Sequence, residues 1–187
     1  MKTTILFAFI SILMCSTSKS ALPEYSKAKV SYSDFEALVK TVKSHRADRL
    51  IDCHQFLEKS KMDNVIILDT RSKNRYDRKH IKGAMHLNFS DFTQDNLAEI
   101  IPDKNTTILI YCNNNFDGDE INFASKIALP KPSEEKKKKT LSLALNIPTY
   151  INLYGYGYRN VYELSELISI FDQRVIYEGT TIQQLDN

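Results

Sequence analysis

The chain has 187 residues, with 25 basic and 23 acidic side chains, and 42% of its residues are hydrophobic. This length suits one domain with a substantial core and is short for two domains. The balanced charge lacks the concentrated basic excess of nucleic-acid-binding proteins, so no nucleic-acid partner is expected. Four consecutive lysines, Lys136 to Lys139, follow two glutamates, and we interpret this run as a solvated loop rather than a polyanion site.

The first twenty residues have the pattern of a secretory signal peptide. Lys2 provides a positive start, Ile5 to Met14 form an apolar run, and small polar residues follow at Ser16 to Ser20. Cleavage after the last of these is predicted, which gives an exported protein, periplasmic or secreted. No membrane anchor is expected after cleavage, because the apolar run is shorter than the roughly 18 residues of a spanning helix. A lipoprotein anchored at Cys15 is the alternative, although a large methionine precedes that cysteine.

Helices and strands alternate along the rest of the chain. Apolar residues at helical spacing predict a helix from Ser33 to about His45, within an N-terminal helical extension over residues 21–47. A second, short helix is predicted from Asp52 to about Lys61. The runs Val65–Leu68 and Thr107–Tyr111 are apolar and rich in β-branched residues, as is typical of strands buried on both faces of a parallel sheet.

Caps, turns and shorter patterns predict the remaining elements. Helices are expected over 74–79, from Ser90 through Leu97, over 121–127 and from Pro148 to about Leu153. We expect a short strand after Gly83 and a last strand over 159–164. Residues 140–145 are expected to form either a strand or a helical turn. Residues of about 125–145 read as an exposed insertion that is a candidate cap for an active site or a candidate surface for a protein partner. The alternation predicts an α/β domain.

The stretch from Val65 to Leu87 reads VIILDTRSKNRYDRKHIKGAMHL and resembles the first signature of rhodanese-like domains. That signature is a buried strand ending in Asp-x-Arg, then Tyr, then His-Ile-x-Gly-Ala. A later buried strand that ends at Cys112, and Gly157 to Tyr162, similar to the family's Gly-Tyr-x-Asn-Val, follow in the same order. The resemblance implies a rhodanese-like central parallel sheet flanked by helices over residues 48–187, after the signal peptide at 1–20 and the N-terminal extension.

The resemblance implies supporting roles for three residues of the first signature. Asp69 and Arg71 are expected to tie loops together beside the active site rather than bind substrate, since charges buried without partners are costly. His80 is expected to fix the geometry of its turn. His80, His86 and nearby acids lack the spacing of metal ligands, so neither a metal nor a cofactor is expected.

Cys112 is the candidate catalytic nucleophile because it follows a central buried strand, where ligands bind in open α/β sheets. Backbone N–H groups and a helix N-terminus at such a place favour a thiolate and can hold an anion. Rhodanese-like sulfurtransferases use this cysteine to take the outer sulfur of thiosulfate or another sulfane-sulfur donor, and they pass the persulfide sulfur to a thiol acceptor. The expected partners are therefore a small sulfur-containing substrate and a thiol acceptor.

The loop that follows Cys112 departs from the family pattern. Active members often have Cys-x-x-Gly-x-Arg, whereas here the residues are Asn113, Asn114, Asn115, Phe116 and Asp117, followed by Gly118. A carboxylate where the arginine is expected would raise the pKa of the cysteine and repel an anionic donor. The alternative function is therefore a catalytically inactive binding or regulatory module. Phosphoryl transfer is disfavoured, because the related phosphatases need arginine where Gly118 stands.

The same loop also has the beginning of a calcium-binding pattern. Asn113, Asn115, Asp117 and Asp119 are spaced as in an EF-hand loop, but the twelfth position is Ala124 instead of glutamate. A turn whose asparagines satisfy their own backbone is the favoured interpretation.

Two cysteines remain after the predicted cleavage, Cys53 and Cys112. In an oxidising compartment they can form one structural disulfide, which is the alternative to a reactive thiol. Cys53 is expected on a peripheral helix far from the strand end, which disfavours this pairing.

Overall fold

The computed structural model describes residues 28–130 and 140–183. Its centre is a five-stranded sheet with the strand order β1-β9-β5-β2-β4, and every neighbouring pair is parallel. The sheet and its flanking helices belong to the compact unit Tyr32–Asn187. The predicted α/β fold with a central parallel sheet is therefore confirmed.

The helices and strands follow one another in this order. They are α1 (Tyr32–Ala47), β1 (Leu50–Ile51), α2 (Cys53–Ser60), β2 (Val65–Asp69), α3 (Lys73–Arg78), β3 (His80–Ile81), β4 (Met85–His86), the 3₁₀ helix η1 (Phe89–Asp91), α4 (Gln94–Ile100), β5 (Thr107–Tyr111), the 3₁₀ helix η2 (Asn113–Asn115), β6 (Phe116–Asp117), β7 (Ile127–Ala128), β8 (Leu141–Ser142), α5 (Asn146–Gly155), β9 (Val161–Leu164), β10 (Ile168–Ser169), β11 (Tyr177–Glu178) and α6 (Thr180–Gln183). Across the described ranges, no helix is both long and apolar enough to cross a membrane.

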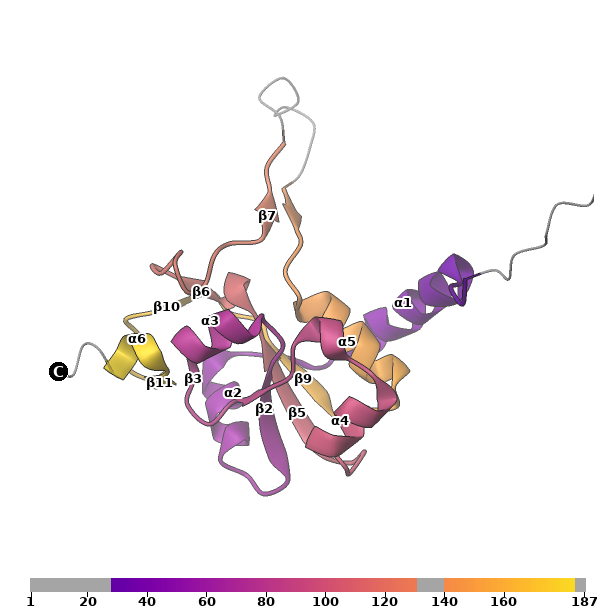
Figure 1. Ribbon diagram of the computed structural model, residues 1–187, viewed down its shortest axis with the longest axis horizontal. Coiled ribbons are helices and arrows are strands. Elements are labelled where there is room, and N and C mark those ends of the chain that lie inside the picture. The colour runs from indigo at the N-terminus through magenta and orange to yellow at the C-terminus, as the bar shows by residue number, and fades with distance from the viewer. Residues whose placement is uncertain (1–27, 131–139, 184–187) are drawn as a thin grey trace, which may run out of the picture. The chain divides into compact units, whose positions relative to one another are not determined.

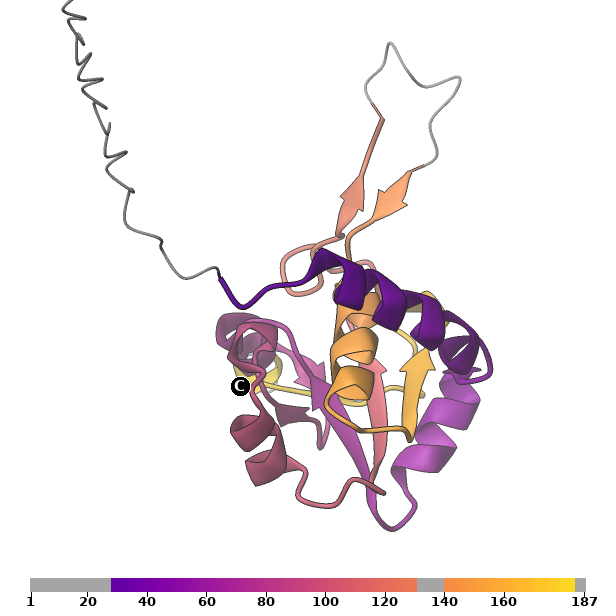
Figure 2. The ribbon, with the colours of Figure 1, turned by 90° about the vertical axis from the view of Figure 1, so that its right-hand side faces the viewer.

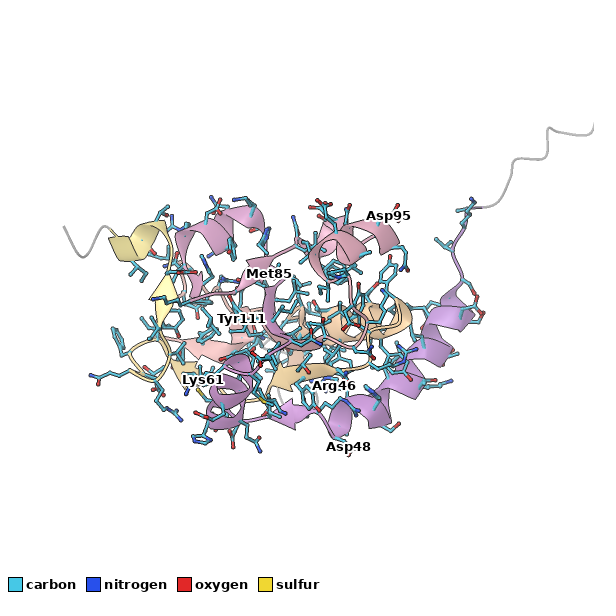
Figure 3. The ribbon with its side chains drawn as sticks, turned by 90° about the horizontal axis from the view of Figure 1, so that it is seen from below. Arg46, Asp48, Lys61, Met85, Asp95 and Tyr111 are labelled. Carbon is cyan, nitrogen blue, oxygen red and sulfur yellow. The ribbon has the colours of Figure 1, made fainter. Side chains whose placement is uncertain are left out.

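Helices cover both faces of the sheet (Figures 1 and 2). The side chains of β5 alternate between two hydrophobic layers, one on each face. Leu109 and Tyr111 pack in one layer with Phe56 of α2. Ile108 and Ile110 pack in the other layer, against residues of α1, α4 and α5. Figure 3 shows Tyr111 inside the domain, where it is almost completely buried. Burial on both faces explains why β5 is a continuous apolar run.

Local signals place most elements where the sequence predicts them, with two exceptions. Thr93, and not Ser90, caps α4, because its hydroxyl accepts the Asn96 N–H at 3.1 Å. The helix expected over 121–127 is wrong: among the described residues this segment holds a turn and the first residue of β7. The Asn122 carbonyl accepts a hydrogen bond from Arg71 instead of taking part in a helix.

The expected insertion contains an antiparallel two-stranded ribbon, β7 with β8, which leaves the body of the domain between β6 and α5 (Figures 1 and 2). A strand or a helical turn was predicted for Thr140 to Leu145, and this segment contains strand β8. The Glu/Lys block between the two strands lies outside the described residues. The ribbon therefore separates Cys112 from helix α5 in the sequence.

Truncation of Leu109 in the central strand tests this core. Leu109 is fully buried and Leu167 is 68% exposed. Leu109→Ala is expected to lower the free energy of unfolding by about 2–5 kcal/mol, because it leaves a cavity between the packed layers. Leu167→Ala, the matched control, is expected to change it by less than about 0.5 kcal/mol. Urea denaturation followed by circular dichroism measures both, and similar losses in the two variants would contradict the packing.

Candidate functional site

Cys112 directly follows the central strand β5 and is the N-cap residue of the 3₁₀ helix η2. Its side chain is 1% exposed, and its Sγ accepts a hydrogen bond from the Leu145 N–H at 3.3 Å. Leu145 precedes α5, so the positive N-terminal end of this helix lies at the sulfur. The helix end that faces Cys112 thus comes after the insertion and not from the adjoining loop.

A cavity of about 420 Å³ opens beside Cys112. Its lining residues are Arg71, Ser72, Arg75, Asn88, Cys112, Asn113, Lys126, Leu143 and Leu145. Three of these side chains are cationic, and none of the described residues that line the cavity is acidic. Because Arg71 is paired with the buried Asp69, the positive charge that a small anion would meet in this space comes from Arg75 and Lys126.

Arg71 is held in a buried network with Asp69 at the carboxyl end of β2. Its Nη2 donates to the Asp69 carboxylate at 2.7 Å, and its Nη1 and Nη2 also donate to the carbonyls of Asn122 and Lys79. Tyr111 donates its hydroxyl hydrogen to the same carboxylate at 2.5 Å. Burial opposes the charge of Arg71, but the hydrogen bond and the negative charge of Asp69 raise its pKa overall. The guanidinium is therefore occupied in tying loops together beside Cys112.

Arg75 and Lys126 are the site residues that sequence reasoning missed. Nη1 of Arg75, on α3, is buried and has no hydrogen-bond partner among the described residues, although the side chain lines the cavity. Lys126 is exposed and reaches the same cavity from the start of the ribbon. The spacing of Arg71 and Arg75, four residues apart around a helix start, was the available signal for the first. The position of Lys126 at the cavity depends on how the insertion folds against the domain.

His80 lies on the short strand β3, which pairs with β11, and it fixes the turn that follows. Its ring stacks on Tyr76 with 3.8 Å between the ring centroids, and its Nδ1 lies 2.6 Å from the Tyr76 carbonyl oxygen. Its Nε2 lies 3.2 Å from Glu178, whose carboxylate also accepts the Gly83 N–H. His80 does not line the cavity of Cys112.

The five residues after Cys112 point in different directions. Asn113 lines the cavity, whereas Asn114 and Asn115 line a second cavity. Phe116 is buried in the hydrophobic layer that contains Tyr111. Asp117 is exposed on β6, which pairs with β10, and it does not line the cavity. The expectation of a carboxylate close to the sulfur at this position is corrected by that strand pairing, which the sequence alone does not reveal.

Burial raises the pKa of the Cys112 thiol above its ordinary value. The N–H groups of Leu145 and Asn113 and the charge of Arg71 act in the opposite direction and only partly offset it. The thiol is therefore the main form at neutral pH in the unliganded site.

Both described cysteines, Cys53 and Cys112, are free buried thiols. Within residues 28–130 and 140–183, no three His, Cys, Asp or Glu side chains are grouped so that they can hold a metal ion. The loop residues named above as an EF-hand pattern are dispersed: Asn113 and Asn115 line different cavities, Asp117 is exposed, and Asp119 is paired with Lys79.

Comparison with known proteins places this geometry in a family. The family model for the rhodanese-like domain matches residues 52–166, more than half of the chain. No curated protein matches the chain. Similar solved structures include the BH2092 protein of Bacillus halodurans, with 17% identity, 79% of this chain and 88% of that chain covered, and a TM-score of 0.47.

Two further similar structures come from other bacteria. The rhodanese-like domain of Alr3790 from Anabaena is 20% identical, covers 73% of this chain and 83% of its own, and has a TM-score of 0.48. A rhodanese with anions from E. coli is 18% identical, covers 62% of this chain and 99% of its own, and has a TM-score of 0.37. The match of the family model, over a segment that contains Cys112 and four of the five strands of the central sheet, shows that the chain belongs to the rhodanese-like domain family.

Proposed function

We propose that the chain is a sulfurtransferase that carries sulfane sulfur as a persulfide on Cys112. The observation that carries the proposal is the cavity beside this thiol, which Arg75 and Lys126 line and to which the described residues bring no acidic side chain. Membership of the rhodanese-like domain family supports sulfur transfer as the class of reaction. The proposed substrate is a small anionic donor of sulfane sulfur, such as thiosulfate.

The proposed reaction has two displacement steps. The Cys112 thiolate attacks the outer sulfur of thiosulfate, the sulfur–sulfur bond of the donor breaks, and sulfite leaves with the electron pair. An acceptor thiolate then attacks the outer sulfur of the Cys112 persulfide and regenerates the Cys112 thiolate. Arg75 would hold the sulfonate oxygens of the donor, while the Leu145 N–H stabilises the negative charge on Sγ.

An inactive module is the less favoured alternative. It rests on the missing loop arginine and on Asp117, which is exposed and outside the cavity. Positive charge from α3 and from the base of the ribbon takes the place of the loop arginine. The cavity thus retains the electrostatic requirement for binding an anionic donor.

Export to the periplasm or the outside belongs to the same proposal and rests on the first twenty residues, which lie outside the described part of the chain. The protein partner expected at the insertion stays a prediction. Ile127 and Leu141, on the two strands of the ribbon, are exposed and would offer apolar surface to such a partner.

Intact mass spectrometry tests the persulfide directly. The protein, expressed with its own leader and incubated with thiosulfate, is expected to gain the mass of one sulfur atom and to lose it on treatment with a thiol. Cys112→Ser is expected to gain none, whereas Cys53→Ser is the matched control that retains the adduct. The same spectrum is expected to show a chain that begins after Ser20. An adduct that persists in Cys112→Ser would contradict the assignment of the nucleophile.

Replacement of Arg75 tests how the donor is bound. Arg75→Gln is expected to lower kcat/KM for thiosulfate by about 10- to 100-fold, the effect of losing a charged hydrogen bond. Lys73→Gln removes one positive charge from the same helix at an exposed position outside the cavity, and it is expected to leave kcat/KM unchanged. Equal losses in both variants would indicate a general effect of charge and not a contact. Thermal denaturation checks that both variants fold.

The raised pKa of Cys112 predicts the pH dependence of its reactivity. Because only the thiolate reacts, alkylation of Cys112 by iodoacetamide is expected to become about tenfold faster per pH unit between pH 7 and 9, without reaching a plateau. Peptide mass spectrometry measures the rate at Cys112 separately from that at Cys53. A plateau below pH 8 would mean that the backbone N–H groups and Arg71 outweigh burial.

A further inference from the structure

A second cavity, of about 320 Å³, shares a wall with the cavity of Cys112. The wall is the segment that leads from β8 into α5, and its side chains alternate between the two sides. Leu143 and Leu145 line the cavity of Cys112, whereas Ser142, Ala144 and Asn146 line the second cavity. This second cavity has no part in the sulfur-transfer steps proposed above.

The side-chain amide of Asn115, which comes from η2 and also lines the second cavity, has only one orientation that satisfies its neighbours. Its Nδ2 donates to the carbonyls of Leu164 and Glu166, at 2.8 and 3.1 Å. Its Oδ1 accepts the Cys112 N–H at 2.9 Å. A flipped amide would place an oxygen against two carbonyl oxygens, so the assignment of nitrogen and oxygen is fixed.

The fixed orientation of Asn115 determines the orientation of Asn146. Asn146 must present its Nδ2 to the Asn115 Oδ1, and the two atoms lie 2.9 Å apart. The amide of Asn146 therefore cannot be flipped so that its Nδ2 takes the place of its Oδ1. This Oδ1 has no hydrogen-bond partner among the described residues. Asn146 is 8% exposed and lines the second cavity. A buried acceptor without a donor is unfavourable, so a molecule in the second cavity that donates an N–H or O–H group to this oxygen would be stabilised.

The other residues of the second cavity define the charge and polarity of a ligand. Arg46 and Glu163 form a bidentate ion pair at 2.5 and 2.6 Å, which leaves the cavity without an uncompensated charge. Arg46 is labelled in Figure 3, at the end of α1 that lies beside the sheet. Leu50, Ala144 and Ile147 supply apolar surface. A cavity with a paired ion pair, one orphan acceptor and apolar walls suits an uncharged molecule with a hydrogen-bond donor.

We propose that the second cavity binds a small uncharged carboxamide, whose N–H donates to the Asn146 Oδ1 and whose body packs on Ala144 and Ile147. A carboxamide supplies this donor without bringing a charge into a cavity whose Arg46 and Glu163 are already paired. Binding at Asn146 is connected to the backbone N–H of Cys112 through one side chain, that of Asn115. Occupancy is therefore expected to change the amide signals of all three residues.

Titration of the full chain with benzamide, followed by ¹H–¹⁵N NMR spectroscopy, tests the proposal. Benzamide is expected to bind saturably and to shift the side-chain amide signals of Asn146 and Asn115 and the backbone signal of Cys112. N,N-dimethylbenzamide has the same ring and carbonyl but no N–H, and it is expected to bind at least about tenfold more weakly. Equal affinity for the two compounds, or no binding of benzamide up to its solubility limit, would overturn the proposal and assign the Asn146 oxygen to solvent.

Two variants locate the bound probe. Ala144→Leu adds a side chain that fills the second cavity, and it is expected to abolish benzamide binding while the dispersed NMR spectrum of a folded protein is retained. Leu143→Ala changes the adjacent residue, which lines the cavity of Cys112, and it is expected to leave binding unchanged. Loss of binding in Leu143→Ala with retention in Ala144→Leu would place the probe in the wrong cavity. Because neither readout involves sulfur transfer, failure here is distinguishable from failure of the proposed enzymatic activity.

Discussion

The buried ion pair between Asp69 and Arg71 is the interaction on which the site depends. It lies at the carboxyl end of β2, and it joins the Tyr111 hydroxyl with the carbonyls of Lys79 and Asn122. Removal of either charge would leave the other buried without compensation, which typically costs about 3–5 kcal/mol. Tyr111 immediately precedes Cys112, so the same network that satisfies the buried charges also holds the end of β5 next to this cysteine.

The insertion determines which helix N-terminus faces Cys112. Because the ribbon of β7 and β8 is placed between η2 and α5, the helix N-terminus at the sulfur is separated from Cys112 by more than thirty residues of sequence. The returning segment, 142–146, then forms one wall for two cavities. The ribbon is thus part of the site at its base, whatever binds to its exposed strands. A side chain that binds an anion can therefore come from the insertion as well as from the loop that follows Cys112.

The sequence predicts the elements of this protein better than it predicts the chemistry of the loop. Val65–Asp69 and Thr107–Tyr111 were predictable because burial on both faces imposes a continuous apolar run. No helix forms over 121–127, where the Asn122 carbonyl instead accepts a hydrogen bond from Arg71, a contact between residues 51 positions apart. Arg75 was missed for a similar reason. Whether a cation on a short helix faces the cysteine depends on how that helix packs, which the spacing of Arg71 and Arg75 does not determine.

The position of Asp117 shows why adjacency in sequence is a poor guide to the electrostatics of this site. Pairing of β6 with β10 holds the backbone of Asp117 at the surface, where its carbonyl accepts the Ile170 N–H. The next acid, Asp119, is neutralised by Lys79 at 3.1 Å. The charges that a donor would meet instead come from Arg75 and Lys126, on either side of the loop. The field at a buried thiol is set by what lines its cavity, because charges in water beyond the wall are screened. For this reason a loop without arginine does not by itself imply an inactive member of the family.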